Sequence, residues 1–360
     1  MAVAEAKGDE RAAAAPPRFT RGERVRAVVI FAVLLFALLA LPSLLSTYWL
    51  KVLTAVAIYS IPCLGLGLLM GRVGLVSLGQ VSVLALGAWV AARLLFLEAG
   101  LPFPVVLLLA GLITMVLGTI VGLPALRLSG LYLALVTLMM AGAITVVLAA
   151  TDFPNGGEGF LGHTEAASGG SDIRRPAIAG TDPAFFRYAV VVAALMFLLA
   201  LWHVRSRPGR AWAAIRQSEP AALAAGVNIT RYKLWAFALA SFMTGVAGGL
   251  LAANVGALYN YQFPTRENII LLAVVLMGGI YSIWGALIAG LFYRFLPALL
   301  DTWGLPADLL TILFGVGILQ VLLTAPAGLI DQFPKDMKKL GGAIARLAGR
   351  GRKPAPEEPG

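Results

Sequence analysis

Charged residues are scarce in this chain of 360 residues. Asp, Glu, Lys and Arg together make up 13% of it, against about 25% in ordinary soluble domains. Hydrophobic residues make up 59%, and the mean hydropathy is +0.86. Since the few charges cannot cover so apolar a surface, lipid rather than water must surround most of it. The composition therefore excludes a soluble enzyme and predicts a polytopic membrane protein.

Cysteine and histidine are almost missing as well. Cys63 is the single cysteine, and His163 and His203 are the two histidines. One cysteine excludes an intrachain disulfide framework, and neither histidine has a second ligand at metal-binding spacing. The sequence also lacks a G-x-x-x-x-G-K-[ST] phosphate loop, a nucleophile elbow and a Ser-His-Asp arrangement. We therefore expect no metal, no cofactor, no catalytic residues and no ATPase site of the chain's own.

Long apolar runs predict an all-α, polytopic integral membrane helical bundle of about ten transmembrane helices, some of them interrupted. The runs cover residues 27–48, 52–70, 75–97, 104–123, 131–150, 187–204, 234–254, 267–281, 282–299 and 305–324. The first run follows two arginines, as a secretory signal would. It is too long for a signal and lacks a clean small-x-small cleavage site, which favours a retained anchor.

The net charge of +10 reflects topology rather than nucleic-acid binding. Of the 28 basic residues, 19 lie in or directly beside the two tails and in one mid-chain loop. The positive-inside rule then predicts that both termini and this loop are cytoplasmic. The expected parts are a cytoplasmic tail (1–24), a transmembrane body (25–325) and a second cytoplasmic tail (326–360). The body contains a cytoplasmic loop (205–233) and an external loop (151–186), and the basic C-terminal tail suits anionic lipid.

Glycine interrupts two apolar runs. Residues 65–87 contain six glycines, and residues 277–285 echo part of this pattern as Met-Gly-Gly-Ile-Tyr-Ser-Ile-Trp-Gly. Backbone freed by such breaks must be satisfied by protein or water, so these segments are expected to face the bundle interior. Ser77, Gln80 and Ser82 are the candidate residues of a translocation path. Close helix packing and interhelical hydrogen bonds explain the same residues equally well.

The mid-chain loop predicts two short helices meeting at an angle. Ala211–Gln217 favours a helix with Trp212 and Ile215 on one face. Ser218 can cap a second helix that has Pro220 in its first turn and ends at Gly226. The small side chains of this second helix suit docking into a groove of another protein, although a solvated connector would have the same composition.

Four segments carry a family resemblance. The first is GRAWAAIRQSEPAALAAGVNITRYKLWAFALASFMTGVAGGL (Gly209–Leu250), and the others are GRVGLVSLGQVSVLALGAW (Gly71–Trp89), LRLSGLYLALVTL (Leu126–Leu138) and GGIYSIWGALIAG (Gly278–Gly290). They resemble the permease subunits of branched-chain amino acid ATP-binding cassette (ABC) importers, and are similar to urea permeases. Pro220 and Leu223 depart from the family pattern, in which an aliphatic and a second acidic residue are usual.

The resemblance implies a multi-pass permease in a bacterial or archaeal cytoplasmic (inner) membrane. Its implied partners are cytoplasmic ATP-binding subunits, a sister permease subunit, an extracytoplasmic substrate-binding protein and membrane lipid, with no nucleic acid. ATP would be used by the partner subunits. The mid-chain loop would be the EAA-type coupling loop, with ATPase-coupling residues Arg216, Glu219, Ala221, Ala222 and Gly226.

The external loop is the expected docking place of the binding protein. It is long and rich in glycine, as functional or disordered loops are. Glu158, Arg174, Arg175 and Arg187 are the candidate docking residues. A mobile, solvated loop without such a role remains the alternative.

Three other functions stay open. A permease for urea or short amides would need the same uncharged path. An ion-coupled secondary transporter is disfavoured because no Asp or Glu falls centrally in a drawn span. A membrane-embedded transferase would need a cluster of acidic or metal-binding residues, which the sequence lacks. Arg294 is the one basic residue in a span that needs explanation, by snorkelling towards the interface or by contact with a substrate.

Overall fold

The computed structural model describes residues 35–36, 38–96, 101–123, 128, 130–150, 175–176, 179–256, 258 and 262–304, and a few single residues between 312 and 319. The chain divides into two units, Met1–Leu45 and Ser46–Gly360. The first contributes one described helical turn, α2 (Leu41–Leu44). The two predicted tails and most of the spans 27–48 and 305–324 lie outside the described residues. Everything below concerns the second unit.

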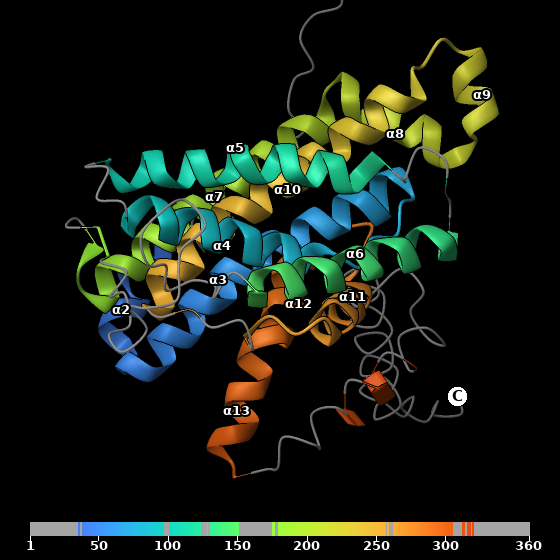
Figure 1. The fold of residues 1–360 in the computed structure, drawn as a ribbon. Helices are drawn as coiled ribbons and strands as arrows, with labels where there is room; N and C mark the ends of the chain where they lie inside the picture. The colour runs from blue at the N-terminus through green and yellow to red at the C-terminus, as the bar shows by residue number, and fades with distance from the viewer. Residues whose placement is uncertain are drawn as a thin grey trace, which may run out of the picture. The chain divides into compact units, whose positions relative to one another are not determined.

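Every regular element among the described residues is helical, which confirms the all-α prediction. The elements are α3 (Thr47–Gly67), η1 (Leu68–Val73), α4 (Gln80–Phe96), α5 (Phe103–Gly122), α6 (Gly130–Ala150), α7 (Asp182–Arg205), α8 (Arg207–Gln217), α9 (Glu219–Ala224), α10 (Ile229–Val255), α11 (Arg266–Gly278), α12 (Gly285–Gly290), η6 (Leu291–Phe295) and α13 (Leu296–Thr302) (Figure 1).

Six described helices are long and apolar enough to cross a membrane. They are Thr47–Val73, Phe103–Ile120, Gly130–Ala150, Asp182–Arg205, Ile229–Val255 and Gly285–Thr302. Two further predicted spans, 75–97 and 267–281, correspond to the shorter helices α4, of 17 residues, and α11, of 13 residues. A multi-pass membrane protein is therefore confirmed, whereas the count of ten helices stays a prediction.

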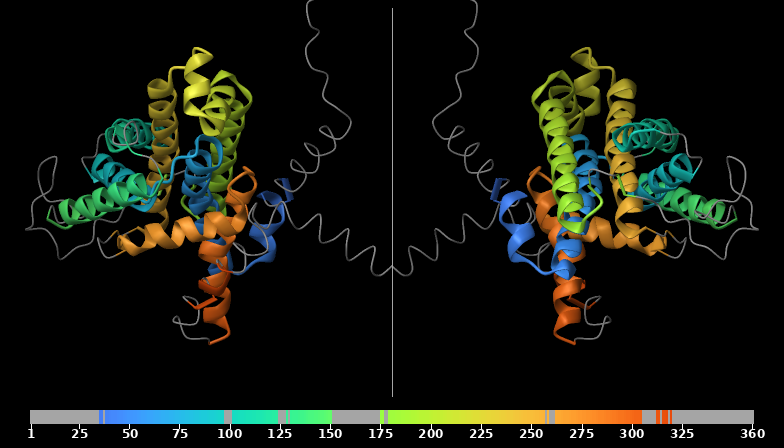
Figure 2. Two further views of the ribbon diagram at one scale, coloured as in Figure 1. Left: turned by 90° about the vertical axis from the view of Figure 1, so that its right-hand side faces the viewer. Right: turned by 90° about the vertical axis from the view of Figure 1, so that its left-hand side faces the viewer.

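Helix α10 forms the centre of the bundle, where it packs against α3, α4 and α5. Figure 2 shows α3, α7 and α10 running in similar directions, with α11 lying across them and α8 and α9 together at one end. In the apolar window of α10, 94% of residues are buried, compared with 28% in α6. Lipid or other subunits must therefore cover α6, whereas α10 is enclosed by the chain's own helices.

Small residues allow α10 to approach its neighbours closely. A Cβ atom added at Gly87 of α4 would lie 2.5 Å from Gly245 Cα of α10. One added at Gly248 would lie 2.4 Å from Leu84 O. Membrane helices gain van der Waals contact through such small-residue crossings, because lipid removes the hydrophobic drive that packs soluble helices. The predicted packing explanation for the glycines thus applies to Gly87.

Two helix breaks face each other. The span that begins with α3 passes into the π-helical η1 and stops at Gly74, whose φ of 85° suits glycine. Helix α11 stops at Gly279, with φ of 110°. A Cβ atom at Gly71 would lie 1.8 Å from Ile280 O, so the two segments that echo each other in sequence are in direct contact.

Candidate functional site

An elbow of two short helices, α8 and α9, joins α7 to α10. Trp212 and Ile215, which the sequence placed on one helix face, are both buried, and the indole Nε1 of Trp212 donates to Tyr232 O at 2.9 Å. Gly209 lets α8 turn back against the end of α7, since a Cβ atom there would lie 1.9 Å from Val204 O. The elbow is thus anchored on both flanking helices.

The second arm of the elbow has the predicted caps. The Ser218 hydroxyl accepts from Ala221 N at 3.4 Å, Pro220 lies in the first turn, and Gly226 follows the helix with φ of 78°. Ala222 is buried, while Ala221 and Leu223 are exposed. One side of α9 is therefore bare backbone and small side chains, with Leu223 as its largest exposed apolar group.

Glu219 does not project freely from α9. Its Oε1 lies 2.7 Å from Lys233 Nζ, and the Lys233 side chain is only 4% exposed while that of Glu219 is 46% exposed. The pair links the first turn of α9 to the first turns of α10. Sequence reasoning did not single out Lys233, because a lysine in a basic loop fits the positive-inside rule without any partner.

Arg216 connects the elbow to both helix breaks. Its Nη1 donates to Gly71 O at 2.7 Å, and its guanidinium lies 4.4 Å from the ring centre of Tyr281. Arg72 Nη2 donates to Tyr281 O at 3.0 Å. These charge-assisted contacts join three parts of the chain into one cluster: α8, η1 and the turn that follows α11. The spacing of these residues in the sequence could not reveal the cluster.

Of the three path candidates, Gln80 and Ser82 lie in the first turn of α4 and Ser77 lies three residues before it, and all are buried. Gln80 Oε1 accepts from Thr244 Oγ1 at 2.9 Å. Asn268 of α11 accepts from Val81 N at 2.8 Å and donates to Ser82 Oγ at 3.4 Å. These bonds satisfy polar groups that lipid could not satisfy.

Thr137 completes this arrangement from α6, where its Oγ1 accepts from Leu78 N at 2.9 Å. Helix α4 therefore begins inside the bundle: Asn268 caps the free N–H of Val81 in its first turn, and Thr137 bonds to the N–H of Leu78 just before the helix. The sequence analysis did not identify Thr137, Thr244 and Asn268 as site residues. Their only signal was being polar within apolar runs.

A charged cluster lies beside this region. The Arg294 guanidinium is 3.9 Å from the ring centre of Tyr59 and 5.2 Å from that of Tyr293, and Arg294 Nε is buried without a hydrogen-bond partner among the described residues. The Tyr293 hydroxyl donates to Glu267 Oε2 at 2.5 Å. Tyr293 lies at the centre of the Gly285–Thr302 helix. Glu267 falls at the start of its own predicted span 267–281, yet its carboxylate contacts a residue at the centre of another span.

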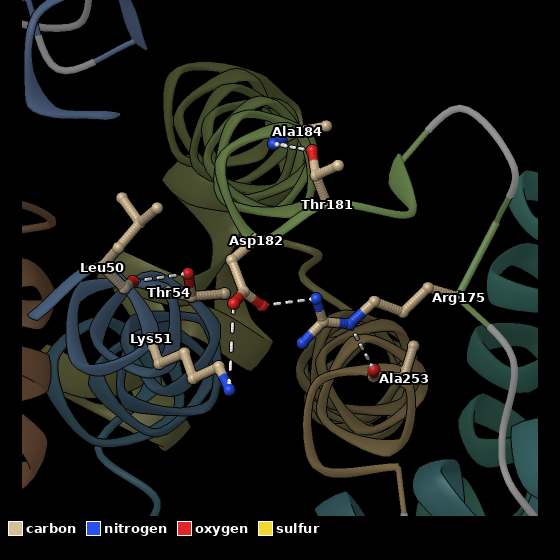
Figure 3. Close-up of polar contacts among 8 residues, drawn as sticks. All are labelled: Leu50, Lys51, Thr54, Arg175, Thr181, Asp182, Ala184 and Ala253. Carbon is tan, nitrogen blue, oxygen red and sulfur yellow. Dashed lines mark hydrogen bonds and ion pairs between the residues drawn. The ribbon is translucent and has the colours of Figure 1, made fainter. Parts of the chain in front are cut away.

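At the opposite end from the elbow, Asp182 holds three elements together (Figure 3). Its Oδ1 lies 2.5 Å from Arg175 Nη1, and its Oδ2 lies 3.8 Å from Lys51 Nζ. Arg175 Nε also donates to Ala253 O at 3.3 Å. This cluster joins α3, α7, α10 and the end of the loop that the sequence predicts to be external, and we name it the outer clamp. Of the other docking candidates, Arg187 is exposed on α7, and Glu158 and Arg174 lie outside the described residues.

The described residues contain no group of three His, Cys, Asp or Glu side chains able to hold a metal ion. What they do contain is a set of neutral hydrogen bonds between helices, one charged cluster at mid-span and an exposed elbow. An all-helical bundle with these apolar helices belongs to the class of multi-pass membrane proteins.

Comparison with known proteins gives the family. Residues 48–322 match the family described as "Branched-chain amino acid transport system / permease component", and the chain belongs to this family. It is 29% identical to the high-affinity branched-chain amino acid transport system permease protein LivM of Escherichia coli, covering 89% of this chain and 79% of the relative. It is 32% identical to the LivM of Salmonella typhimurium, covering 74% and 67%. The predicted family is thereby confirmed.

A shorter stretch resembles a sugar permease. The fructose import permease protein FrcC of Rhizobium meliloti is 36% identical over 30% of this chain and 33% of that protein. No solved structure matches the chain.

Proposed function

We propose that this chain is the transmembrane subunit of an ABC importer that forms half of a path for branched-chain amino acids. The observation that carries the proposal is the elbow, whose exposed arm is tied through Arg216 to both helix breaks. The LivM relatives, named for branched-chain amino acid transport, favour this cargo. The remaining subunits would be two ATP-binding subunits, a sister permease and an extracytoplasmic binding protein.

In this proposal α9 is the EAA-type coupling helix and docks on an ATP-binding subunit. Ala221, Leu223 and Gly226 face outwards and supply the contact, while Ala222 and the Glu219–Lys233 pair hold α9 on the body. Arg216 passes a displacement of the elbow to η1 and to the turn at Tyr281. Closure of the ATPase dimer then shifts the equilibrium between inward-open and outward-open states.

The proposal includes the topology expected from the sequence. Ten spans would place the tails 1–24 and 326–360 in the cytoplasm, with 25–325 as the permease body and 151–186 outside. The chain would use no cofactor and hydrolyse no ATP. Ser77, Gln80 and Ser82 would border the path, since they lie where α4 begins inside the bundle.

The outer end would receive the binding protein through Glu158, Arg174, Arg175 and Arg187. Arg175 would position this end of the loop rather than bind the partner directly, because its guanidinium already bonds to Asp182 and to Ala253 O. Urea or short amides remain the alternative cargo, since the path candidates are uncharged. Ion coupling remains a weaker alternative to which Glu267 gives some support.

Reconstitution tests the proposed function. The chain is co-expressed with candidate ATP-binding, sister permease and binding-protein subunits, purified, and placed in proteoliposomes. We expect the subunits to co-purify, and leucine uptake to require both ATP inside the vesicles and the binding protein. Uptake by the purified chain alone, or uptake driven by an ion gradient without ATP, would overturn the proposal.

A further inference from the structure

A positively charged side chain lies at mid-depth on a partly exposed face of the chain. Arg294 lies at the centre of the apolar helix Gly285–Thr302. Tyr59, over which its guanidinium lies at 3.9 Å, is at the centre of the apolar helix Thr47–Val73. Two independent helices therefore place this charge in the middle of the membrane.

Snorkelling does not explain the position. A snorkelling arginine extends along its helix so that its charge reaches the interface. The Arg294 guanidinium instead lies between the rings of Tyr59 and Tyr293, whose centres are 4.9 Å apart. Both tyrosines are buried, and they hold the charge at the depth of the span centres.

The surroundings satisfy Arg294 only in part. Aromatic faces attract a guanidinium but do not replace its hydrogen bonds. Its Nε is buried without a hydrogen-bond partner among the described residues. Glu267 accepts from Tyr293, so a negative charge lies within the same cluster and offsets the arginine.

Exposure of Arg294 to hydrocarbon would cost a large free energy. Charged side chains at the centre of a bilayer therefore face other protein groups or water. One permease supplies half of a path, so residues that border the path lie on its surface when the chain is described alone. Glu267 is likewise half-buried, and Asn268 beside it bonds to the start of α4, where the path candidates lie. The half-buried charged cluster therefore lies next to the buried polar groups at the start of α4, because Glu267 and Asn268 are neighbours in α11.

We propose that Arg294 borders the translocation path and binds the carboxylate of a free amino acid as the cargo passes mid-membrane. This inference rests on the proposed function and adds a cargo contact to it. A guanidinium pairs with a carboxylate through paired, directional hydrogen bonds. The adjacent Glu267 carboxylate keeps the cluster neutral overall, which suits a zwitterionic cargo and a site that releases it readily.

Uptake assays test the role in the assembled transporter. Arg294→Gln is expected to lower leucine uptake at least tenfold, and Arg294→Lys, which keeps the charge, about threefold. ATP hydrolysis stimulated by the binding protein should stay within twofold of wild type for both. Arg266→Gln, the same chemical change at the exposed first residue of α11, is the matched control and should leave uptake within twofold.

The reaction of a cysteine at position 294 with a water-soluble thiol reagent provides a second test. Protection by leucine would not be expected if Arg294 had only a structural role. Arg294→Cys, in a background with Cys63→Ala, should react with a negatively charged methanethiosulfonate reagent and react at least fivefold more slowly when leucine and its binding protein are present. Leu195→Cys, at an exposed apolar position near the middle of α7, should not react.

The outcomes separate the two proposals. Absence of ATP-dependent leucine uptake by the wild-type complex would overturn the proposed function. Wild-type uptake with unchanged transport by Arg294→Gln would overturn this inference alone. So would an unreactive Arg294→Cys, or one that leucine does not protect. If Arg294→Gln does not assemble, the Arg294→Lys uptake and the labelling of Arg294→Cys decide between the same outcomes.

Discussion

The Glu219–Lys233 pair shows how one contact can serve both stability and coupling. Lys233 is nearly enclosed and forms an ion pair with Glu219. Loss of Glu219 therefore leaves a buried cation without the negative charge that offsets its desolvation. We predict that Glu219→Lys detaches α9 from α10 and lowers ATP-driven uptake at least tenfold, while the membrane level of the protein stays within twofold. Uptake and immunoblotting of membranes measure the two quantities.

A double substitution checks the cause. Glu219→Gln with Lys233→Met removes both charges and should recover at least part of the uptake lost by Glu219→Gln alone. Equal loss in the single and double variants would show that Glu219 acts on a partner subunit rather than through Lys233.

Asn268 is a second residue whose role depends on its neighbours. It is 1% exposed and bonds to Val81 N and Ser82 Oγ. Asn268→Leu would leave a buried N–H without a partner, and we expect a loss of about 1–3 kcal/mol of stability. A lower thermal midpoint in detergent would report it. The adjacent Ile269→Leu, at an exposed site, should leave the midpoint unchanged.

At the scale of the element, the crossing of α4 and α10 depends on glycine. Gly87→Leu has no room, since its Cβ alone would lie 2.5 Å from Gly245 Cα. We expect the variant to lose more than about 3 kcal/mol of stability, as overpacked cores do at their worst, and to be depleted from the membrane at least fivefold.

Gly67 of α3 supplies the matched control for that crossing. Nothing lies within 4 Å of a Cβ atom there. Gly67→Ala should therefore be neutral or stabilising by up to about 1 kcal/mol, because alanine favours helix over glycine. A Gly87→Leu protein as abundant and as stable as Gly67→Ala would contradict the described crossing.

The end of α9 is the second element-scale test. Gly226 has φ of 78° and open space around it, so backbone strain rather than a clash limits substitution. We predict that Gly226→Val uncouples ATP hydrolysis from uptake, lowering leucine transported per ATP at least fivefold. Gly226→Asn, which tolerates positive φ, should keep most of the coupling. Normal coupling in both variants would remove α9 from the proposed docking surface.

For the whole molecule, the proposed orientation places the elbow and the outer clamp on opposite sides of the membrane. In a Cys63→Ala background, Ala225→Cys should be labelled by a membrane-impermeant maleimide only in inside-out vesicles. Thr181→Cys, next to the outer clamp, should be labelled only from the other side. Labelling of both positions from one side would contradict the topology drawn from the basic residues.

The family and the helical class followed from sequence patterns that are local. The caps of α9 are an example, since Ser218, Pro220 and Gly226 define a helix within nine residues of chain. The predicted span 267–281 corresponds to α11, a helix of 13 residues that lies across α10, because apolar content alone determines neither the length nor the direction of a helix. The site was predicted only in part. Gln80 and Ser82 were identified because they lie in a glycine-rich segment, whereas Asn268 lies in an apolar run without such a signal.

Composition, run length and cap residues by themselves determined that this protein is a helical membrane protein with a two-armed elbow, because these features depend on neighbours a few positions away. The tertiary structure alone decided which polar groups meet. Arg216 reaches Gly71 across 145 positions of sequence, and Val81 reaches Asn268 across 187. Such pairs form because the glycine-mediated crossings and the two helix breaks bring distant segments to the same depth, where lipid leaves polar groups no other partner.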